Sequence, residues 1–232
     1  MTHQPGTIII PIPGQMRYPQ FTYSLATLRQ PDDTALHIIA SASVAENINA
    51  AIREMHGQWV WICGDDHVFS PDLLMRLLDR EEDIVAPVCY TRVPPFTPVI
   101  YRDEGTKVVA GREYPAYERV GLHELPQSGL VEVDAVGSAG LLVRKHVLDT
   151  IGDPWFAYSE GAIVNEDLEF CRRAREHGYR VHVDTGLRLG HIGNYVIWPE
   201  HRGTRSGFLI DLGGQGVNEV LQLTENETFA HA

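Results

Sequence analysis

The most constraining feature of this sequence is an unbroken run of five apolar residues at 59–63. A strand that is covered on both faces has such a run, and doubly covered strands belong to mostly parallel sheets. Three further apolar runs of strand length lie at 7–10, 36–40 and 84–88. Helices are expected between them, at 18–28, 44–56 and 73–78. This alternation predicts an α/β fold, with a Rossmann-like, mostly parallel sheet that is flanked by helices.

The rest of the chain is less regular. Residues 94–129 are rich in Pro and Tyr, which predicts loops and a hairpin. Further elements are expected in this order: strands at 130–136 and 141–143, a short helix from residue 145, a helix at 165–176 and a strand at 180–184. Weak periodicity after residue 202 predicts a flexible tail at 203–232. A chain of 232 residues can build one core, so a single domain over 1–202 is expected.

Composition excludes several classes of protein. The 19 Lys and Arg residues against 31 Asp and Glu give a net charge of −12, which disfavours broad nucleic-acid binding. Cys63, Cys89 and Cys171 have no Cys-x-x-Cys spacing, which disfavours a disulfide scaffold and a structural zinc site and suits a reducing cytoplasm. The N-terminus has no basic segment and no apolar run approaches ~18 residues, so we expect neither a signal peptide nor a membrane span.

The first candidate site follows the buried strand at 59–63. Gly64-Asp65-Asp66-His67 comes directly after it, and ligands of α/β sheets gather beyond the carboxyl ends of the strands. Carboxylate oxygens together with an imidazole suit Mg²⁺ or Mn²⁺. In an extended chain Asp65 and His67 point to one side and Asp66 to the other. The alternative interpretation is a polar loop in which Asp66 satisfies backbone amides.

Two later segments offer further candidates. Glu166 and Asp167 fall in the first turn of an expected helix, where the dipole stabilises carboxylates, although acidic residues are also ordinary there. Adjacent carboxylates repel each other, so one of the two is expected to titrate above a free carboxylate. His191 lies between two glycines that permit close approach of a ligand, although a single histidine is more often structural.

The order of these segments resembles the GT-A glycosyltransferases, which transfer sugars from nucleoside diphosphates. The helix and strand over 49–66 are similar to those that precede the D-x-D motif of that family, and Pro11 matches the proline that ends the first strand. Residues 137–144 resemble the glycine-rich turn near the acceptor, 165–172 the E-D motif helix, and 183–191 the closing strand with its metal-binding histidine.

The resemblance covers about residues 6 to 195 and implies a GT-A domain over 1–202. Its nucleotide-binding half would span about 6–90 and its acceptor-side half about 130–202. It also implies a set of residues that contact the nucleotide sugar: Pro11, Asn49, Asp65, Arg92 and Gly140.

The metal motif fits the family in two registers. In the first, the leading Asp of D-x-D falls on Gly64 and the third position, the usual metal ligand, falls on Asp66. This register pairs Asp66 with His191 and leaves Asp65 and His67 as alternates or ribose contacts. A shift by one residue makes Asp65-Asp66-His67 a D-x-H motif, as in polypeptide GalNAc-transferases.

The resemblance implies transfer of a sugar from a nucleotide-diphosphate sugar to a hydroxyl acceptor, with inversion at the anomeric carbon. An acidic protein would need a divalent cation, Mn²⁺ or Mg²⁺, to neutralise the leaving diphosphate. Asp167 would be the base, with Glu166 second, while Arg92 and Arg202 would contact phosphate or acceptor. The expected donor is a UDP-sugar, or else a GDP-sugar. The expected acceptor is a glycan, a lipid, a small molecule or a modified base.

Three other functions are weighed against this one. A sugar-phosphate nucleotidyltransferase needs a basic, glycine-rich loop after its first strand, whereas residues 11–17 hold one glycine and one arginine. A metal-dependent phosphoesterase needs more carboxylate and histidine ligands than the sequence offers. A non-catalytic nucleotide-sugar binder is the serious rival, because Gly64 replaces the first Asp of the motif.

Overall fold

The computed structural model describes residues 3–12, 18–40, 42–159, 164–193, 195–211 and 219–226. Its helices are α1 (Pro19–Thr27), α2 (Val44–Arg53), α3 (Leu73–Leu78), α4 (Lys145–Ile151) and α5 (Glu166–Glu176), with a 3₁₀ turn η1 (Leu122–Glu124). Its first strands are β1 (Thr7–Pro11), β2 (Ala35–Ile39), β3 (Trp59–Ile62), β4 (His67–Val68), β5 (Ile84–Cys89), β6 (Ile100–Val109) and β7 (Arg112–Arg119). The later strands are β8 (Leu130–Val133), β9 (Ala135–Val136), β10 (Leu141–Arg144), β11 (Val181–Ile192), β12 (Val196–Arg202), β13 (Arg205–Asp211) and β14 (Glu219–Glu225).

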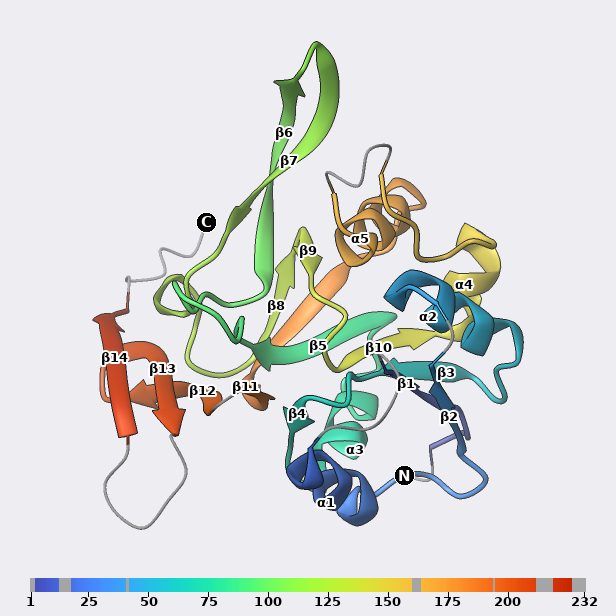
Figure 1. Cartoon of the computed structure of the whole chain (residues 1–232), viewed down its shortest axis with the longest axis horizontal. Coiled ribbons are helices and arrows are strands. Elements are labelled where there is room, and N and C mark those ends of the chain that lie inside the picture. The colour runs from blue at the N-terminus through green and yellow to red at the C-terminus, as the bar shows by residue number, and fades with distance from the viewer. Residues whose placement is uncertain are drawn as a thin grey trace.

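One large sheet crosses the molecule in the order β14-β13-β12-β11-β5-β10-β3-β1-β2 (Figure 1). Strand β1 pairs in parallel with β2 and β3, and β5 pairs in parallel with β11. Strand β10 lies antiparallel between β3 and β5. The predicted α/β fold is therefore confirmed. Its sheet is mixed, because β10 in the middle and β12, β13 and β14 toward one edge run antiparallel to their neighbours.

Burial on both faces holds the central strands in place. Ile8, Trp59 and Trp61 pack into the cluster on one face of the sheet. Ile9 and Val60 pack into the cluster on the other face. All of these side chains are buried, which confirms the prediction for the run at 59–63. Burial of this apolar area contributes about 25 cal/mol for each Å² removed from water.

Local signals set the approach to β3. Helix α2 begins with a capping box, in which the Ser43 hydroxyl accepts the Glu46 N–H and the Glu46 carboxylate accepts the Ser43 N–H, both at 3.3 Å. After the helix, Gly57 has a φ of +84°, and a Cβ there would lie 2.1 Å from the Pro5 carbonyl oxygen. A glycine is needed at this turn, which directs the chain into β3.

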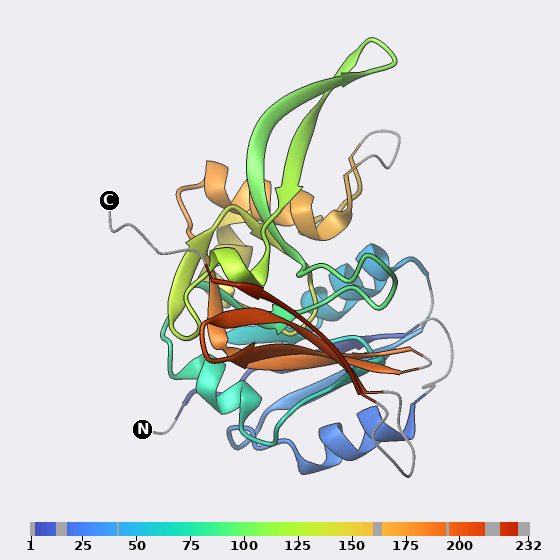
Figure 2. The same cartoon turned by 90° about the vertical axis from the view of Figure 1, so that its left-hand side faces the viewer.

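The irregular regions agree with expectation at one point and differ from it at another. Residues 94–129 contain the expected hairpin, formed by β6 and β7, and it projects as a long arm from the body (Figures 1 and 2). The tail expected to be flexible instead carries β13 and β14, which extend the large sheet at one edge (Figure 2). Residues 13–17 and 227–232 lie outside the described residues. No described helix is long and apolar enough to cross a membrane.

Candidate active site

A cavity of about 730 Å³ lies where β1, β3 and β5 reach their carboxyl ends, beside β11 and the start of α5. It brings together eight of the predicted site residues: Pro11, Asp65, Asp66, His67, Arg92, Glu166, Asp167 and His191. Sheet topology explains this convergence, because the ends of parallel strands meet at one edge.

Asp66 is the centre of a charged cluster in this cavity. Its Oδ1 lies 3.1 Å from His67 Nδ1. Its Oδ2 lies 2.6 Å from Arg92 Nη1 and 3.4 Å from His191 Nε2. The two histidines are register partners in the antiparallel pair of β4 and β11, and their rings stack with centroids 4.5 Å apart. Asp66, His67 and His191 therefore form one group, which joins the Asp66–His191 pair of the first register to His67 of the second.

The charges of the cluster shift one another. Burial alone would raise the pKa of Asp66, but hydrogen bonds from His191 and His67 outweigh burial and hold this pKa well below its ordinary value. Burial alone would lower the pKa of each histidine, but their contacts with Asp66 raise both above the ordinary value. A cation that displaces the histidine protons would find an ionised carboxylate beside two ring nitrogens.

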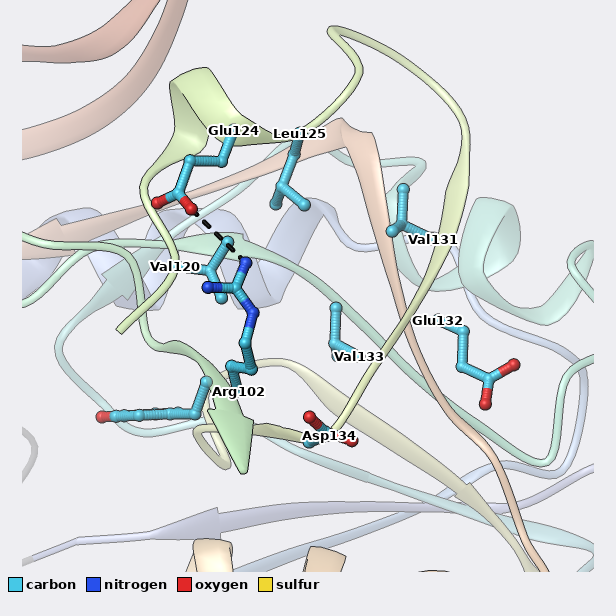
Figure 3. A pocket seen from close by; sticks show the side chains of 9 residues that line it. Arg102, Val120, Glu124, Leu125, Val131, Glu132, Val133 and Asp134 are labelled. Atoms are coloured by element: carbon cyan, nitrogen blue, oxygen red, sulfur yellow. Dashed lines mark hydrogen bonds and ion pairs between the residues drawn. The ribbon is translucent and has the colours of Figure 1, made fainter. Parts of the chain in front are cut away.

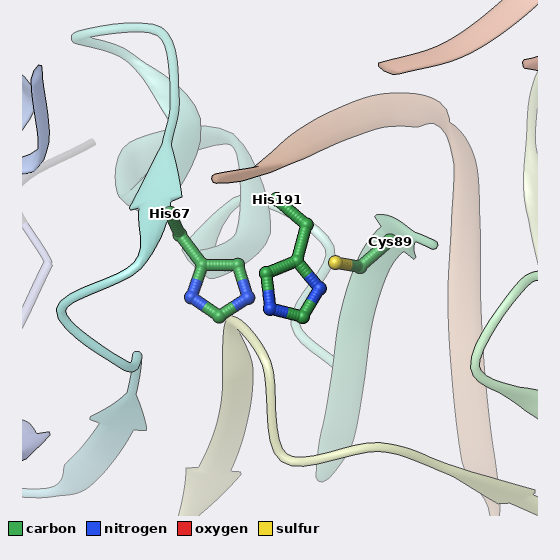
Figure 4. A group of neighbouring side chains, drawn as sticks. All are labelled: His67, Cys89 and His191. Atoms are coloured by element: carbon green, nitrogen blue, oxygen red, sulfur yellow. The ribbon is translucent and has the colours of Figure 1, made fainter. Parts of the chain in front are cut away.

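Cys89 belongs to the same group, although its position in the sequence predicts no role for it. The ligand atoms of His67, Cys89 and His191 all lie within 4.8 Å of one another (Figure 4). Burial tends to raise the pKa of the Cys89 thiol, but contacts with His191 and His67 lower it to about 7. One signal could have identified the residue, since Cys89 ends a strand of the same sheet edge as Asp66. All three cysteines are free and buried.

The donor set fits a divalent cation. The ring nitrogen His67 Nε2 is buried and has no hydrogen-bond partner among the described residues, which is costly for a polar atom unless a ligand meets it. Backbone carbonyls hold the other ring nitrogens, Gly64 O at 3.1 Å from His67 Nδ1 and Tyr90 O at 2.8 Å from His191 Nδ1. Such contacts orient histidine ligands in metal sites.

Asp167 faces the cavity from the first turn of α5. Its Oδ2 accepts the Ser138 N–H at 3.3 Å and its Oδ1 accepts the Leu168 N–H at 2.8 Å. Burial, followed by the charge of Glu166, raises the pKa of Asp167 to about 6 despite these hydrogen bonds. The predicted upward shift of one of the two carboxylates is confirmed, with burial as the larger cause. A carboxylate with this pKa suits a general base near neutral pH.

Three of the predicted contact residues are not among those that line this cavity. The buried Asn49 amide instead bonds both backbone groups of Phe156, with Nδ2 donating at 2.7 Å and Oδ1 accepting at 3.0 Å. Gly140 has a φ of +73° and packs on Pro87. Arg202 lies on β12 and pairs with Glu200 at 3.2 Å. All three have structural roles that sequence spacing alone could not reveal.

The glycine before His191 also serves packing rather than ligand access. A Cβ at Gly190 would lie 2.7 Å from Val68 Cγ2 and 3.0 Å from the Trp198 ring. This close approach seats β11 against β4 and thereby fixes the position of His191.

A second, smaller cavity of about 370 Å³ opens near the base of the β6–β7 hairpin (Figure 3). Its walls combine aliphatic side chains such as Val120, Leu125 and Val133 with carboxylates. Its Arg102 is already paired with Glu124 at 3.4 Å. The cavity therefore offers a partly neutralised, acidic surface without the converging histidine and thiol groups of the larger cavity.

Comparisons with known proteins agree with this geometry. The family described as "Glycosyltransferase like family 2" matches residues 26–191. Protein A197 from STIV has a similar structure, with a TM-score of 0.53, 16% identity and 97% of each chain covered. GalNAc-T7, solved with UDP, GalNAc and Mn²⁺, gives a TM-score of 0.57 at 9% identity, over 81% of this chain and 44% of that one. These structures share the GT-A type of fold with this chain. No curated protein matches the sequence.

Proposed function

The chain belongs to the glycosyltransferase-like family 2, and from this premise we propose that it moves a sugar from a nucleotide-diphosphate sugar to a hydroxyl acceptor. The observation that carries the proposal is the shared cavity, in which the Asp66 cluster and Asp167 face one space of about 730 Å³. Pockets that bind small molecules and cofactors typically have volumes of about 300–1,000 Å³.

On the donor side, Asp66, His67 and His191 would hold a divalent cation. The unpartnered His67 Nε2 and the ionised Asp66 support this role. A bound divalent cation neutralises the charge that develops on a leaving diphosphate. Mn²⁺ suits imidazole ligands better than Mg²⁺, which prefers oxygen. The similar GalNAc-T7 structure, which was solved with UDP and Mn²⁺, supports UDP as the first donor to test.

Arg92 would serve the same diphosphate. Its guanidinium lies 2.6 Å from Asp66 Oδ2 and its side chain is 40% exposed, so it can turn toward an anion when a cation takes over that carboxylate. Pro11 and Asp65, which also line the cavity, would contact the nucleoside. Arginine binds phosphate oxygens through paired N–H groups.

On the acceptor side, Asp167 would take the proton of the attacking hydroxyl. The acceptor oxygen then bonds to the anomeric carbon, while the bond from that carbon to the phosphate oxygen breaks and its electron pair leaves with the nucleoside diphosphate. A single displacement of this kind inverts the anomeric centre. Glu166, which is 8% exposed, would keep Asp167 partly protonated until donor and acceptor are bound.

The test is a panel of UDP-, GDP- and dTDP-sugars with Mn²⁺, measured by thermal shift and by release of the nucleoside diphosphate. Asp66→Asn and His191→Ala should abolish metal-dependent donor binding, whereas the exposed Asp32→Asn should bind as the parent does. If Asp65→Asn and His67→Ala are the damaging pair instead, the D-x-H register is correct. Unchanged affinity in all four site variants would contradict the proposed donor site.

A non-catalytic binder remains the second candidate, favoured by Gly64 in place of an Asp. It would bind the nucleotide in a metal-dependent way without hydrolysis or transfer. Turnover in the donor panel therefore separates the two functions, because an enzyme releases nucleoside diphosphate with time and a binder does not.

A further inference from the structure

The strongest unassigned feature is the thiol inside the proposed cation site. Cys89 ends β5, His67 belongs to β4 and His191 to β11, so three separate strands bring these groups together. Their ligand atoms lie within 4.8 Å of one another (Figure 4). The Asp66 carboxylate contacts both rings. The cavity is therefore lined at one point by a carboxylate, two imidazoles and a thiol.

A second observation indicates that this group awaits a ligand. His67 is 4% exposed, and its Nε2 has no hydrogen-bond partner among the described residues. The opposite nitrogen, Nδ1, lies 3.1 Å from the Gly64 carbonyl oxygen, which leaves Nε2 to face the cluster. A buried nitrogen without a partner destabilises the folded protein, and a cation at this point would remove that cost.

We propose that Cys89 is a ligand of this cation site, and that the site prefers a thiol-binding cation such as Zn²⁺ or Co²⁺ to Mg²⁺. Two imidazoles and a sulfur are three donors within 4.8 Å of one another, and Zn²⁺ in catalytic sites commonly takes three protein ligands and keeps a fourth position open. Magnesium favours oxygen ligands and water and gains little from sulfur. This inference rests on the proposed function only in using the same cluster; it concerns metal identity and not transfer.

Cobalt provides the direct test, because a sulfur-to-cobalt bond adds a charge-transfer absorption in the near ultraviolet. Reduced, metal-free protein is titrated with Co²⁺ alone. The parent should develop this band, Cys89→Ser should lose it, and the matched control Cys171→Ser should keep it. Cys171 is equally buried, but its thiol contacts the Val136 carbonyl instead of the cluster.

Affinity gives the second measurement. Competition with a chromogenic chelator should show Zn²⁺ binding weakened in Cys89→Ser by at least about tenfold, the lower end of the 10–100-fold loss typical for residues that support a metal site. Mn²⁺ binding, measured in the same way, should change much less. Equal Zn²⁺ affinity in Cys89→Ser and Cys171→Ser would overturn the proposal.

X-ray absorption of the zinc-loaded parent requires no variant and remains decisive if Cys89→Ser fails to fold. Sulfur bonded to zinc is expected, and a site with only nitrogen and oxygen neighbours would contradict the role of Cys89. The outcomes also separate the two proposals. Metal binding through sulfur without sugar transfer would leave this inference intact and remove the enzymatic one, whereas transfer with Mn²⁺ by a protein lacking the cobalt–sulfur band would do the reverse.

Discussion

At position 64 the absence of a side chain shapes the proposed cation site. A Cβ on Gly64 would lie 2.8 Å from Asp66 Oδ1 and 3.4 Å from the His67 ring. The Asp66 carboxylate folds back over this glycine to reach His67 at 3.1 Å. The departure from D-x-D is therefore built into the local geometry, because an Asp at position 64 would occupy the space that Asp66 uses.

Gly64→Ala should consequently weaken metal binding by about tenfold while leaving the fold intact, since the added methyl group moves a carboxylate rather than backbone. Gly193→Ala is the matched control, because a Cβ there would meet its nearest described atom at 3.8 Å. Titration of both variants with Co²⁺ or Mn²⁺ checks the prediction. Parent-like affinity in Gly64→Ala would show that the carboxylate position is not critical.

Asp167 makes a prediction about pH. Its pKa is raised to about 6 in the folded protein from a reference value of 3.8, so the protonated form is favoured by folding. This stabilisation is complete below pH 3.8 and is lost as pH rises through about 6. Asp167→Asn has no such titrating group and avoids the loss. The unfolding free energy of the variant minus that of the parent should therefore increase by about 1–3 kcal/mol from pH 4 to pH 8.

Urea unfolding at the two pH values measures this difference. An Asn side chain can accept only one of the two backbone hydrogen bonds at this position, but that loss is the same at both pH values.

The same substitution should lower transfer by roughly 10²-fold or more at constant donor affinity, and Glu166→Gln should lower it less. A parent-like transfer rate in Asp167→Asn would leave the residue with a structural role alone.

At the scale of elements, an irregularity in β11 sets where His191 lies. The register of the β11–β5 pairing shifts between Asp184 and Arg188. Asp184 is the register partner of Pro87, whereas Leu189 is the partner of Cys89. The buried Asp184 carboxylate holds this bulge, accepting the Gly186 N–H at 2.9 Å and pairing with Arg80 at 2.6 Å. His191 follows two residues after Leu189 and is thereby carried to the cluster.

Arg80→Ala would leave the Asp184 carboxylate buried without its ion pair. We expect a loss of about 1–3 kcal/mol in unfolding free energy, below the 3–5 kcal/mol of a fully buried pair because Arg80 is 38% exposed. Metal affinity should fall with it. Arg29→Ala is the control, since Arg29 is 70% exposed and lies 4.0 Å from Asp72. Similar denaturation midpoints for both variants would argue against this role of the bulge.

The β6–β7 hairpin is the element best suited to acceptor choice. Residues 104–113 at its end are exposed, with Val108 at 68%, and exposed loops on a rigid sheet often carry specificity. Removal of residues 104–113 should leave donor affinity and thermal stability unchanged while reducing transfer to a large acceptor.

Hydrogen exchange should show greater protection over 94–129 when donor binds. Identical protection with and without donor would contradict the expected movement.

For the whole molecule, local sequence patterns predicted where the buried strands lie, but they did not predict how all of the strands pair. Runs at 7–10, 59–63 and 84–88 predicted their strands because burial on both faces leaves an unbroken apolar pattern. The antiparallel direction of β10 depends on partners distant in the sequence, and β13 and β14 at the sheet edge lack a strong apolar pattern. In the site, motif order predicted Asp66 and His191, which the structure places in one cluster. The proximity of the Cys89 thiol to this cluster was missed, because it depends on the three-dimensional fold.

The proximity of Cys89 and His191 also has a consequence for the rate at which the protein unfolds. Cys89 and His191 meet only after a long stretch of chain has closed and β11 has paired with β5, and closing long loops costs entropy before any contact repays it. In the folding transition state these two ligands are not yet together. A cation bound by both groups should therefore stabilise the native state much more than the transition state. Its stabilisation should appear as slower unfolding, with refolding nearly unchanged. Stopped-flow traces with metal and with chelator would differ on the unfolding limb, so the lifetime of the native sheet would follow the supply of cation.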